Sequence, residues 1–157
     1  MFFISTWDAS APQGNKANLN SPALTGVPTI NGSKISIIEP PTWYDLPLTD
    51  DVQTYHASTK TAYCKNYFGM VYITFYIKRT NSLDFPLGSN TIANLPTGCR
   101  PDKNVHAVAS ISLTGNTIYS QNSLVCFVTP NGNVNIHVPM AGVKAVTGTI
   151  VFYAQEN

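Results

Sequence analysis

The sequence is poor in charged residues. They make up 11% of the 157 residues, and the formal net charge is +1, whereas an ordinary soluble protein has roughly 25% charged residues. The chain has no run of lysine or arginine, and clustered positive charge is what binds phosphate backbones. The sequence therefore predicts that nucleic acid is not a partner. Asn, Thr, Ser, Gly and Pro supply the polar share, which suits a β-protein exposed to variable salt and also fits β-rich domains in general.

Cysteine is scarce and odd in number. Cys64, Cys99 and Cys126 include no C-x-x-C pair, so the sequence favours free thiols over a zinc site or a disulfide framework. The opening residues Met1–Ile4 lack a basic flank and a full apolar core, and we expect neither a signal peptide nor membrane insertion. Three scattered histidines and the lack of a glycine-rich phosphate loop predict no cofactor and no metal.

Helical periodicity is also lacking, and 11 prolines are spread along the chain. The two-residue period of strands is present instead, and it predicts an all-β fold: an antiparallel sandwich, a jelly roll or a small barrel. Residues 70–77 are dense in β-branched and aromatic side chains, which predicts a central strand. Residues 147–154 are apolar on both faces, which predicts a central strand or one that lies against another subunit.

Three further segments have strand patterns. Alternation over residues 105–113 predicts a half-buried strand. Residues 124–129 and 134–138 flank Asn131-Gly132, which predicts a hairpin with a type I′ turn. Residues 52–59 alternate without a cleanly apolar face, which predicts an edge or interface strand.

Two segments show neither pattern. Between Leu95 and Pro101, two prolines and Gly98 favour extended and turn conformations, so we expect a stiff connection. Residues 8–34 are rich in Asn, Ser, Gly and Pro and poor in large apolar side chains, so they cannot form a core alone. We therefore expect an N-terminal segment over residues 1–40 and a C-terminal β-head over residues 41–157.

Four motifs in this order carry a family resemblance: Trp43–Thr49, Tyr63–Val71, Leu95–Pro101 and Pro130–Val134. Together they resemble the heads of bacteriophage tail-fibre and receptor-binding proteins. The third motif is similar to the family's Leu-Pro-x-Gly-aromatic-Arg-Pro signature, with Cys99 in place of the aromatic residue. Residues 15–32 resemble the Asn-, Pro- and Thr-rich segments that form trimeric stalks in phage fibres, although a flexible linker would have a similar composition.

The resemblance implies a homotrimer of β-sandwich heads on a short extended N-terminal stalk, formed by residues 1–40. It implies that this stalk mediates trimerisation and attaches to other tail or baseplate proteins. It also implies a virion location at the tail tip or baseplate, after synthesis in the host cytoplasm. The implied function is attachment to a host cell-surface polysaccharide or a teichoic-acid-like glycan. A structural trimeric tip or baseplate spacer without receptor contact is the alternative, and a glycan hydrolase or esterase is the second alternative.

The carboxylates do not favour an enzyme. Glycoside hydrolysis needs two carboxylates about 5 to 9.5 Å apart across the scissile bond, and the only adjacent pair is Asp50-Asp51. Neighbouring residues on a strand face opposite sides. No local signature selects a Ser-His-Asp or Cys-His site. We therefore expect no catalytic residues.

Saccharide binding needs an aromatic ring for the C–H face of a sugar and polar groups for its hydroxyls. Three polar segments with an aromatic residue could supply them, at residues 53–56, 81–85 and 116–122. For each, an ordinary polar loop is the alternative interpretation. The candidate ligand-binding residues are Tyr55, His56, Asp84, Asn116, Tyr119, Gln121 and Asn122.

Overall fold

The computed structural model describes residues 29–30, 33–34, 40–113 and 119–155. The chain divides into two units, Met1–Ile38 and Glu39–Asn157. In the first unit, β1 (Thr29–Ile30) pairs with β2 (Ser33–Lys34) in antiparallel register. The role of residues 1–40 as a stalk falls mostly outside the described residues and stays a prediction.

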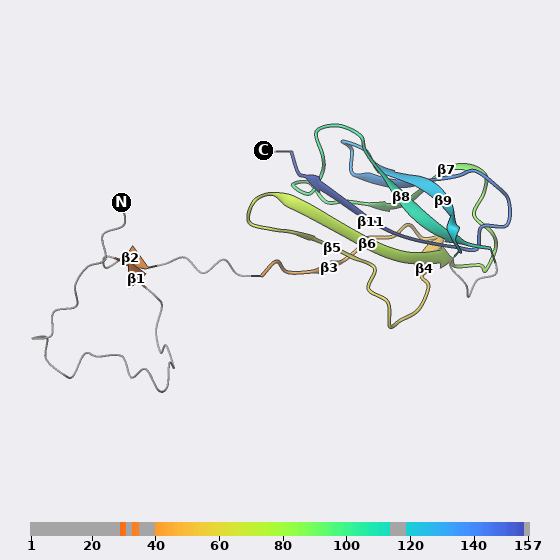
Figure 1. Cartoon of the computed structure of the whole chain (residues 1–157), viewed down its shortest axis with the longest axis horizontal. Helices are drawn as coiled ribbons and strands as arrows, with labels where there is room; N and C mark the ends of the chain where they lie inside the picture. The colour runs from red at the N-terminus through yellow and green to blue at the C-terminus, as the bar shows by residue number, and fades with distance from the viewer. Residues whose placement is uncertain (1–28, 31–32, 35–39, 114–118, 156–157) are drawn as a thin grey trace, which may run out of the picture. The chain divides into compact units, whose positions relative to one another are not determined.

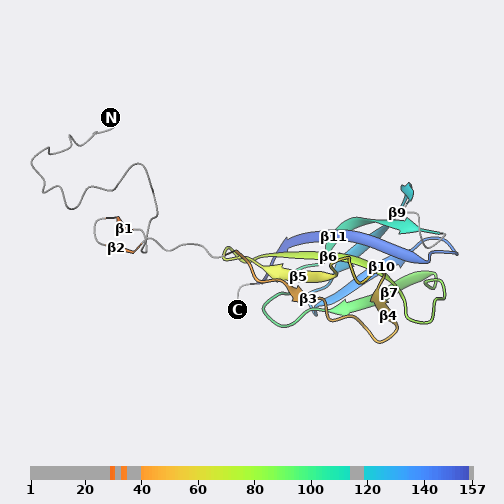
Figure 2. The same ribbon diagram turned by 90° about the horizontal axis from the view of Figure 1, so that it is seen from below.

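The second unit, here called the head, is one curled antiparallel sheet (Figures 1 and 2). The strand order is β3-β5-β6-β11-β8-β9-β10-β7, and β4 pairs with β6 beside β5. The strands are β3 (Tyr44–Asp45), β4 (Val52–Thr54), β5 (Ala62–Lys65), β6 (Met70–Arg79), β7 (Gly88–Asn94), β8 (Val105–Ser112), β9 (Tyr119–Val128), β10 (Asn133–Val138) and β11 (Ala145–Tyr153). The described residues contain no helix, and so none that could span a membrane. The predicted all-β, antiparallel fold is confirmed.

The two edges of the curled sheet meet. Leu48, which follows β3, forms a bridge with Ala93 of β7. On either side of it, the Thr49 N–H donates to the Ile92 carbonyl at 3.0 Å and the Asn94 N–H donates to the Pro47 carbonyl at 3.1 Å. This closure covers the end of β7, which would otherwise be free to pair with other chains.

The core fills the inside of the curl. On β6, buried and half-buried residues alternate along the strand, as expected for one face turned inward. Gly148 of β11 leaves room for the largest core ring, because a Cβ atom there would lie 2.8 Å from Phe75 and 2.9 Å from Ala109. The fully buried large side chains are Phe75, Ile73, Ile77, Ile92, Leu95, Ile111, Ile136, Ile150, Val71, Val128, Val134 and Val138.

Several strand predictions are confirmed. The predicted strand over 70–77 is β6, which lies between β11 and the pair β4 and β5, and the last strand, β11, lies between β6 and β8. The predicted strand over 52–59 is too long: β4 ends at Thr54, and residues 55–61 leave the sheet as a loop. All three cysteines are free thiols, as expected. Burial raises the pKa of Cys126 to about 11, because an apolar environment disfavours the thiolate.

The β9–β10 hairpin is present, but its predicted turn type is wrong. The turn is closed by the Gly132 N–H, which donates to the Thr129 carbonyl at 2.8 Å. Gly132 has a φ of +89°, whereas Asn131 does not have a positive φ. A type I′ turn needs two central residues with positive φ. Pro130 fixes a negative φ at the first central position, so the glycine takes the positive φ one position later.

The connection after β7 is tied to this hairpin. The Leu95 N–H donates to the Gly132 carbonyl at 2.8 Å, and the Arg100 Nε donates to the Leu95 carbonyl at 2.9 Å. A Cβ atom on Gly132 would lie 2.7 Å from the Leu95 carbonyl oxygen. Gly98 has a φ of +89° in the turn closed by the Cys99 N–H and the Pro96 carbonyl. The stiff connection predicted from the prolines and glycine is therefore a structural joint.

Candidate functional site

The strand register gives the head two distinct ends. β6 ends where β11 begins, since Lys78 pairs with Ala145, and Ala145 also pairs with Ser112 near the end of β8. Residues 80–87 and 139–144 therefore lie at the same end, here called the loop end. The opposite end, here called the entry end, holds the β5–β6 turn and the first described residues of the head (Figure 1). A site at the loop end is thus away from the point where the chain enters the head.

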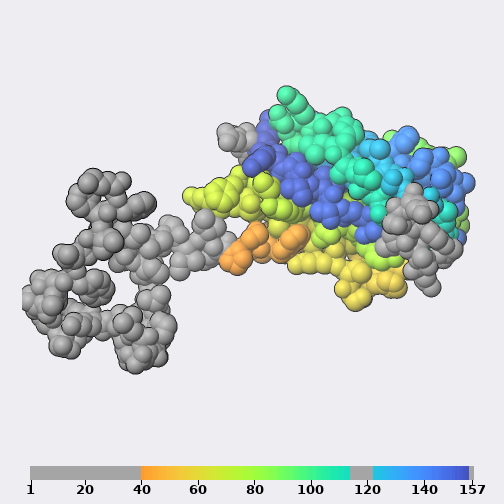
Figure 3. All heavy atoms as spheres, viewed as in Figure 1, coloured from red at the N-terminus to blue at the C-terminus, as the bar shows by residue number. Residues whose placement is uncertain are grey.

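The loop at residues 55–61 is pinned at its neck to one residue of β6. The Tyr55 N–H donates to the Tyr76 carbonyl at 2.8 Å. At the other side of the neck, the buried Thr61 hydroxyl accepts from the Tyr76 N–H at 3.2 Å and lies 3.3 Å from its carbonyl. Within the loop, the Thr59 N–H and hydroxyl both donate to the His56 carbonyl, at 3.0 and 2.7 Å. The loop is therefore held in one shape although it projects from the head (Figure 3, yellow).

An aromatic cluster lies beside this neck. The Tyr55 ring stacks on the Tyr76 ring with centroids 4.6 Å apart, and His56 meets Tyr55 edge-on at 4.4 Å. The Lys78 Nζ lies 5.2 Å from the Tyr55 ring centroid. Burial raises the pKa of Tyr76, and the neighbouring Tyr55 raises it by a smaller amount. The cluster presents a fixed aromatic surface with a cation above it.

Tyr55 and Lys78 line a hollow of about 160 Å³ together with Ser82, Leu83 and Lys144, here called the tyrosine hollow. Asp84 pairs with Lys144 at 3.1 Å. The structure thus brings two of the three candidate segments together: Tyr55 lines the hollow, His56 packs on its ring, and Asp84 holds one of its lysines. The two lysines could not be selected from the sequence, because only the β6–β11 register places them side by side.

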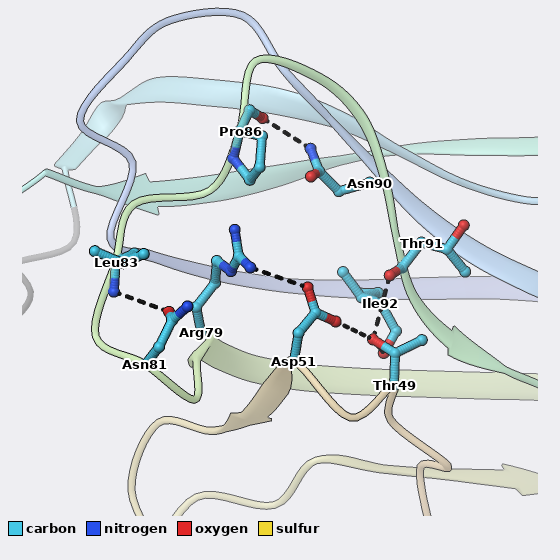
Figure 4. Close-up of polar contacts among 9 residues, drawn as sticks. All are labelled: Thr49, Asp51, Arg79, Asn81, Leu83, Pro86, Asn90, Thr91 and Ile92. Carbon is cyan, nitrogen blue, oxygen red and sulfur yellow. Dashed lines mark hydrogen bonds and ion pairs between the residues drawn. The ribbon is translucent and has the colours of Figure 1, made fainter.

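Polar contacts fix the segment that supplies the other wall of the tyrosine hollow (Figure 4). Arg79 pairs with Asp51 at 3.4 Å, and the other carboxylate oxygen of Asp51 accepts from the Thr49 hydroxyl at 2.9 Å. The Asn81 side chain accepts from the Leu83 N–H at 3.1 Å. Both oxygens of Asp51 are therefore engaged, one by Arg79 of β6 and the other by the nearby Thr49. This gives Asp51, a member of the adjacent acid pair, a structural role.

A second, larger hollow of about 480 Å³ lies at the edge of the loop. It is here called the polar hollow. The sequence did not indicate it, because its wall joins Asp45 of β3 to Ser58 and Lys60 of the loop. The Lys60 Nζ also lies 4.8 Å from the Trp43 ring centroid. The lining residues are Asp45, Leu46, Thr54, Ala57, Ser58, Thr59, Lys60 and Thr61.

The third candidate segment joins neither hollow in the part of the chain that the structure describes. Asn116 and the side chains of Tyr119 and Gln121 lie outside the described residues. Asn122 is half-buried. It lies in an irregular stretch of β9, since Ser110 pairs with Ser123 whereas Ile111 pairs with Tyr119. The ligand role of all seven candidate residues stays a prediction.

Comparison with known proteins gives a likeness in fold. No family model and no curated protein sequence matches this chain. The crystal structure of the receptor binding protein (gp15) of Listeria phage PSA is similar, with a TM-score of 0.58 and 18% identity over 76% of this chain and 68% of that one. The head domain of lactococcal phage bIL170, described as a receptor binding domain, has a TM-score of 0.54 and 11% identity over 74% of this chain and 100% of that one. The head therefore has a fold similar to those of phage receptor-binding proteins, as the sequence motifs suggested.

Proposed function

We propose that this chain is a bacteriophage receptor-binding protein that attaches the virion to a saccharide on the host cell surface, without chemistry. The observation that carries the proposal is the tyrosine hollow, in which a fixed aromatic ring adjoins two lysines away from the entry end. The fold likeness to two phage receptor-binding proteins supports it.

The tyrosine hollow suits an acidic sugar. The C–H face of a pyranose packs on aromatic rings, and the Tyr55 ring, which stacks on Tyr76 and has Lys78 above it, would accept a sugar as Lys78 moves to the acidic substituent. Lys78 and Lys144 line the same hollow and would pair with a phosphate or carboxylate substituent through charge-assisted hydrogen bonds. A cell-surface polysaccharide or a teichoic-acid-like glycan has both features. Since the tyrosine hollow is small, at about 160 Å³, firm attachment would come from several heads binding at once.

A homotrimer is the second part of the proposal. The outward-facing residues described on β8, β9 and β11 include no Asp, Glu, Lys or Arg, and Val108 and Tyr153 are 69% and 63% exposed. Uncharged surface with exposed apolar side chains is typical of the buried centre of an interface. The residues concerned are His106, Val108, Ser110, Ser123, Val125, Phe127, Thr147, Thr149, Val151 and Tyr153. The N-terminal segment would attach the trimer to other tail or baseplate proteins.

Binding to cells tests the receptor role. The purified, fluorescently labelled full chain is titrated against a panel of bacterial strains, and Tyr55→Ala is compared with Tyr67→Ala. Tyr67 is 82% exposed in the β5–β6 turn at the entry end, so it controls for the loss of a surface tyrosine. We expect Tyr55→Ala to weaken binding to a recognised strain about tenfold or more, as for a central aromatic anchor, and Tyr67→Ala to bind normally.

Two results would overturn the proposal. If saturating protein binds no strain on a broad panel, the chain is better described as a structural tip or spacer. If incubation shortens or deacylates the wall polysaccharide, the protein is an enzyme. Sedimentation tests the trimer separately, and a stable monomer at micromolar concentration would contradict that part.

A further inference from the structure

The two hollows lie on opposite sides of the same piece of chain. Thr54, the last residue of β4, pairs with the buried Ile77, so it faces the inner side of the sheet. Tyr55 is the next residue and stacks on the outer side against Tyr76. Thr54 lines the polar hollow, and Tyr55 lines the tyrosine hollow. The two hollows therefore adjoin at the start of the loop, where Thr54 faces one and Tyr55 faces the other, and the rest of the loop lines the polar hollow.

We propose that the polar hollow is a second saccharide subsite, and that one glycan chain lies across the loop with consecutive parts in the two hollows. This inference rests on the proposed function, and it specifies the ligand as a polymer rather than a single sugar.

The sizes of the hollows support a shared ligand. Sites that hold a whole small molecule have volumes of about 300 to 1,000 Å³. The polar hollow, at about 480 Å³, falls within this range, whereas the tyrosine hollow, at about 160 Å³, falls below it. The tyrosine hollow can therefore accept only part of a ligand, and the remainder must extend beyond it.

The two linings select different parts of the polymer. The polar hollow has hydroxyl groups from Thr54, Ser58 and Thr59, together with one cation, Lys60, and one carboxylate, Asp45. These groups donate and accept hydrogen bonds without net charge, so they suit a neutral, hydroxyl-rich unit. The tyrosine hollow supplies a ring face and two lysines. The ligand predicted here is a glycan in which a unit with an acidic substituent adjoins a neutral one.

The rigid loop makes the two contacts cooperative. Because its neck is bonded to Tyr76 on both sides, little conformational freedom is lost when a glycan spans it. Once one unit is bound, the next binds as an intramolecular event at a high effective concentration. Affinity should therefore rise steeply at the fragment length that first reaches both hollows. We expect a gain of about a hundredfold or more over the shortest fragment that binds.

The test uses wall polysaccharide from a strain that the full chain binds, partly hydrolysed and separated by length. Affinities of the fragments are measured by calorimetry for the wild type, Tyr55→Ala, Ser58→Leu and Thr54→Val. Ser58→Leu places an apolar side chain in the polar hollow, and Thr54→Val removes one hydroxyl with little change of shape. Asn104→Leu, on an exposed loop at the entry end, is the matched control, and thermal unfolding checks that each variant is folded.

The expected pattern is specific to the two-hollow arrangement. Tyr55→Ala should weaken fragments of all lengths, whereas Ser58→Leu and Thr54→Val should weaken only long fragments, by about tenfold and about threefold. Two outcomes would contradict the second subsite and leave the receptor role intact. One is an affinity that does not depend on fragment length. The other is a folded Ser58→Leu variant that binds long fragments as tightly as Asn104→Leu does. If Tyr55→Ala also has no effect, the proposed site itself is wrong.

Discussion

The entry end and the loop end of the head are stabilised in different ways. At the entry end, prolines and glycines fix the backbone, the turn at Gly132 packs directly on the Leu95 carbonyl, and the Arg100 side chain donates to that same carbonyl. At the neck of the loop and at the loop end, side chains from distant segments fix the structure: Thr61 bonds to Tyr76, and Asp84 pairs with Lys144. A joint made of backbone tolerates few substitutions. A surface made of side chains can change its residues while the sheet is kept, which suits a binding site.

The largest effect is expected at the entry end, for Gly132→Ala. Its φ of +89° is unfavourable for alanine, and the new Cβ would lie 2.6 Å from Arg100 Nε and 2.7 Å from the Leu95 carbonyl oxygen. We expect a loss of about 2 to 4 kcal/mol in the free energy of unfolding, from strain and overpacking together. Gly142→Ala is the matched control, because its φ is +85° and its site is open. Denaturant unfolding that gave equal losses would contradict the direct contact.

The second effect concerns alkaline pH and the buried core. Burial raises the pKa of Cys126 to about 11 in the folded protein, above the 9.0 of an exposed thiol. The folded state therefore keeps its proton longer, and this contribution to stability is complete below pH 9 and is lost as the pH rises through 11. The loss is up to about 2 to 3 kcal/mol. Unfolding measured between pH 8 and 11 should show a shallower decline for Cys126→Ala than for the wild type. Parallel declines would argue against this assignment.

The third effect concerns the neck of the loop. Thr61→Val removes the hydroxyl that accepts from the Tyr76 N–H and leaves that donor unpaired. The free energy of unfolding should fall by about 1 to 3 kcal/mol, and binding of long glycan fragments should weaken because the loop is no longer held. Thr80→Val, on the exposed turn after β6, is the control. Unchanged binding in a measurably destabilised Thr61→Val would show that the neck does not position the hollows.

The smallest effect on stability is expected for Asp84→Asn. Its ion pair with Lys144 is well exposed, and such pairs contribute less than about 1 kcal/mol. Binding should change more than stability, because Lys144 lines the tyrosine hollow and loses the partner that orients it. Thermal unfolding and fragment affinity measured on the same preparation separate the two effects. A large drop in melting temperature with unchanged affinity would reverse this interpretation.

The sequence predicted what depends on nearby residues. The density of β-branched and aromatic residues identified β6, alternation identified β8, and the residues around Gly98 predicted the joint after β7. The predicted turn type at Gly132 is wrong because Pro130, which precedes Asn-Gly, fixes a negative φ at the first central position of the turn. The strand predicted over 52–59 is too long because the Tyr76 N–H, which a longer β4 would have bonded, donates to the Thr61 hydroxyl instead.

The hollows depend on contacts that a local pattern does not contain. Tyr55 was a candidate, but its proximity to Lys144 follows from the pairing of β4 and β11 with β6. The polar hollow joins Asp45 to Ser58, which no short motif contains. These are long-range consequences of strand order, and they required the structure.

We propose above that the tyrosine hollow holds the host glycan. The most direct measurement is a crystal structure of the head soaked with a wall-polysaccharide fragment from a strain that the protein binds. We predict a sugar ring packed on Tyr55, with its acidic substituent between Lys78 and Lys144. A fragment bound at another surface, with this hollow empty, would contradict the account.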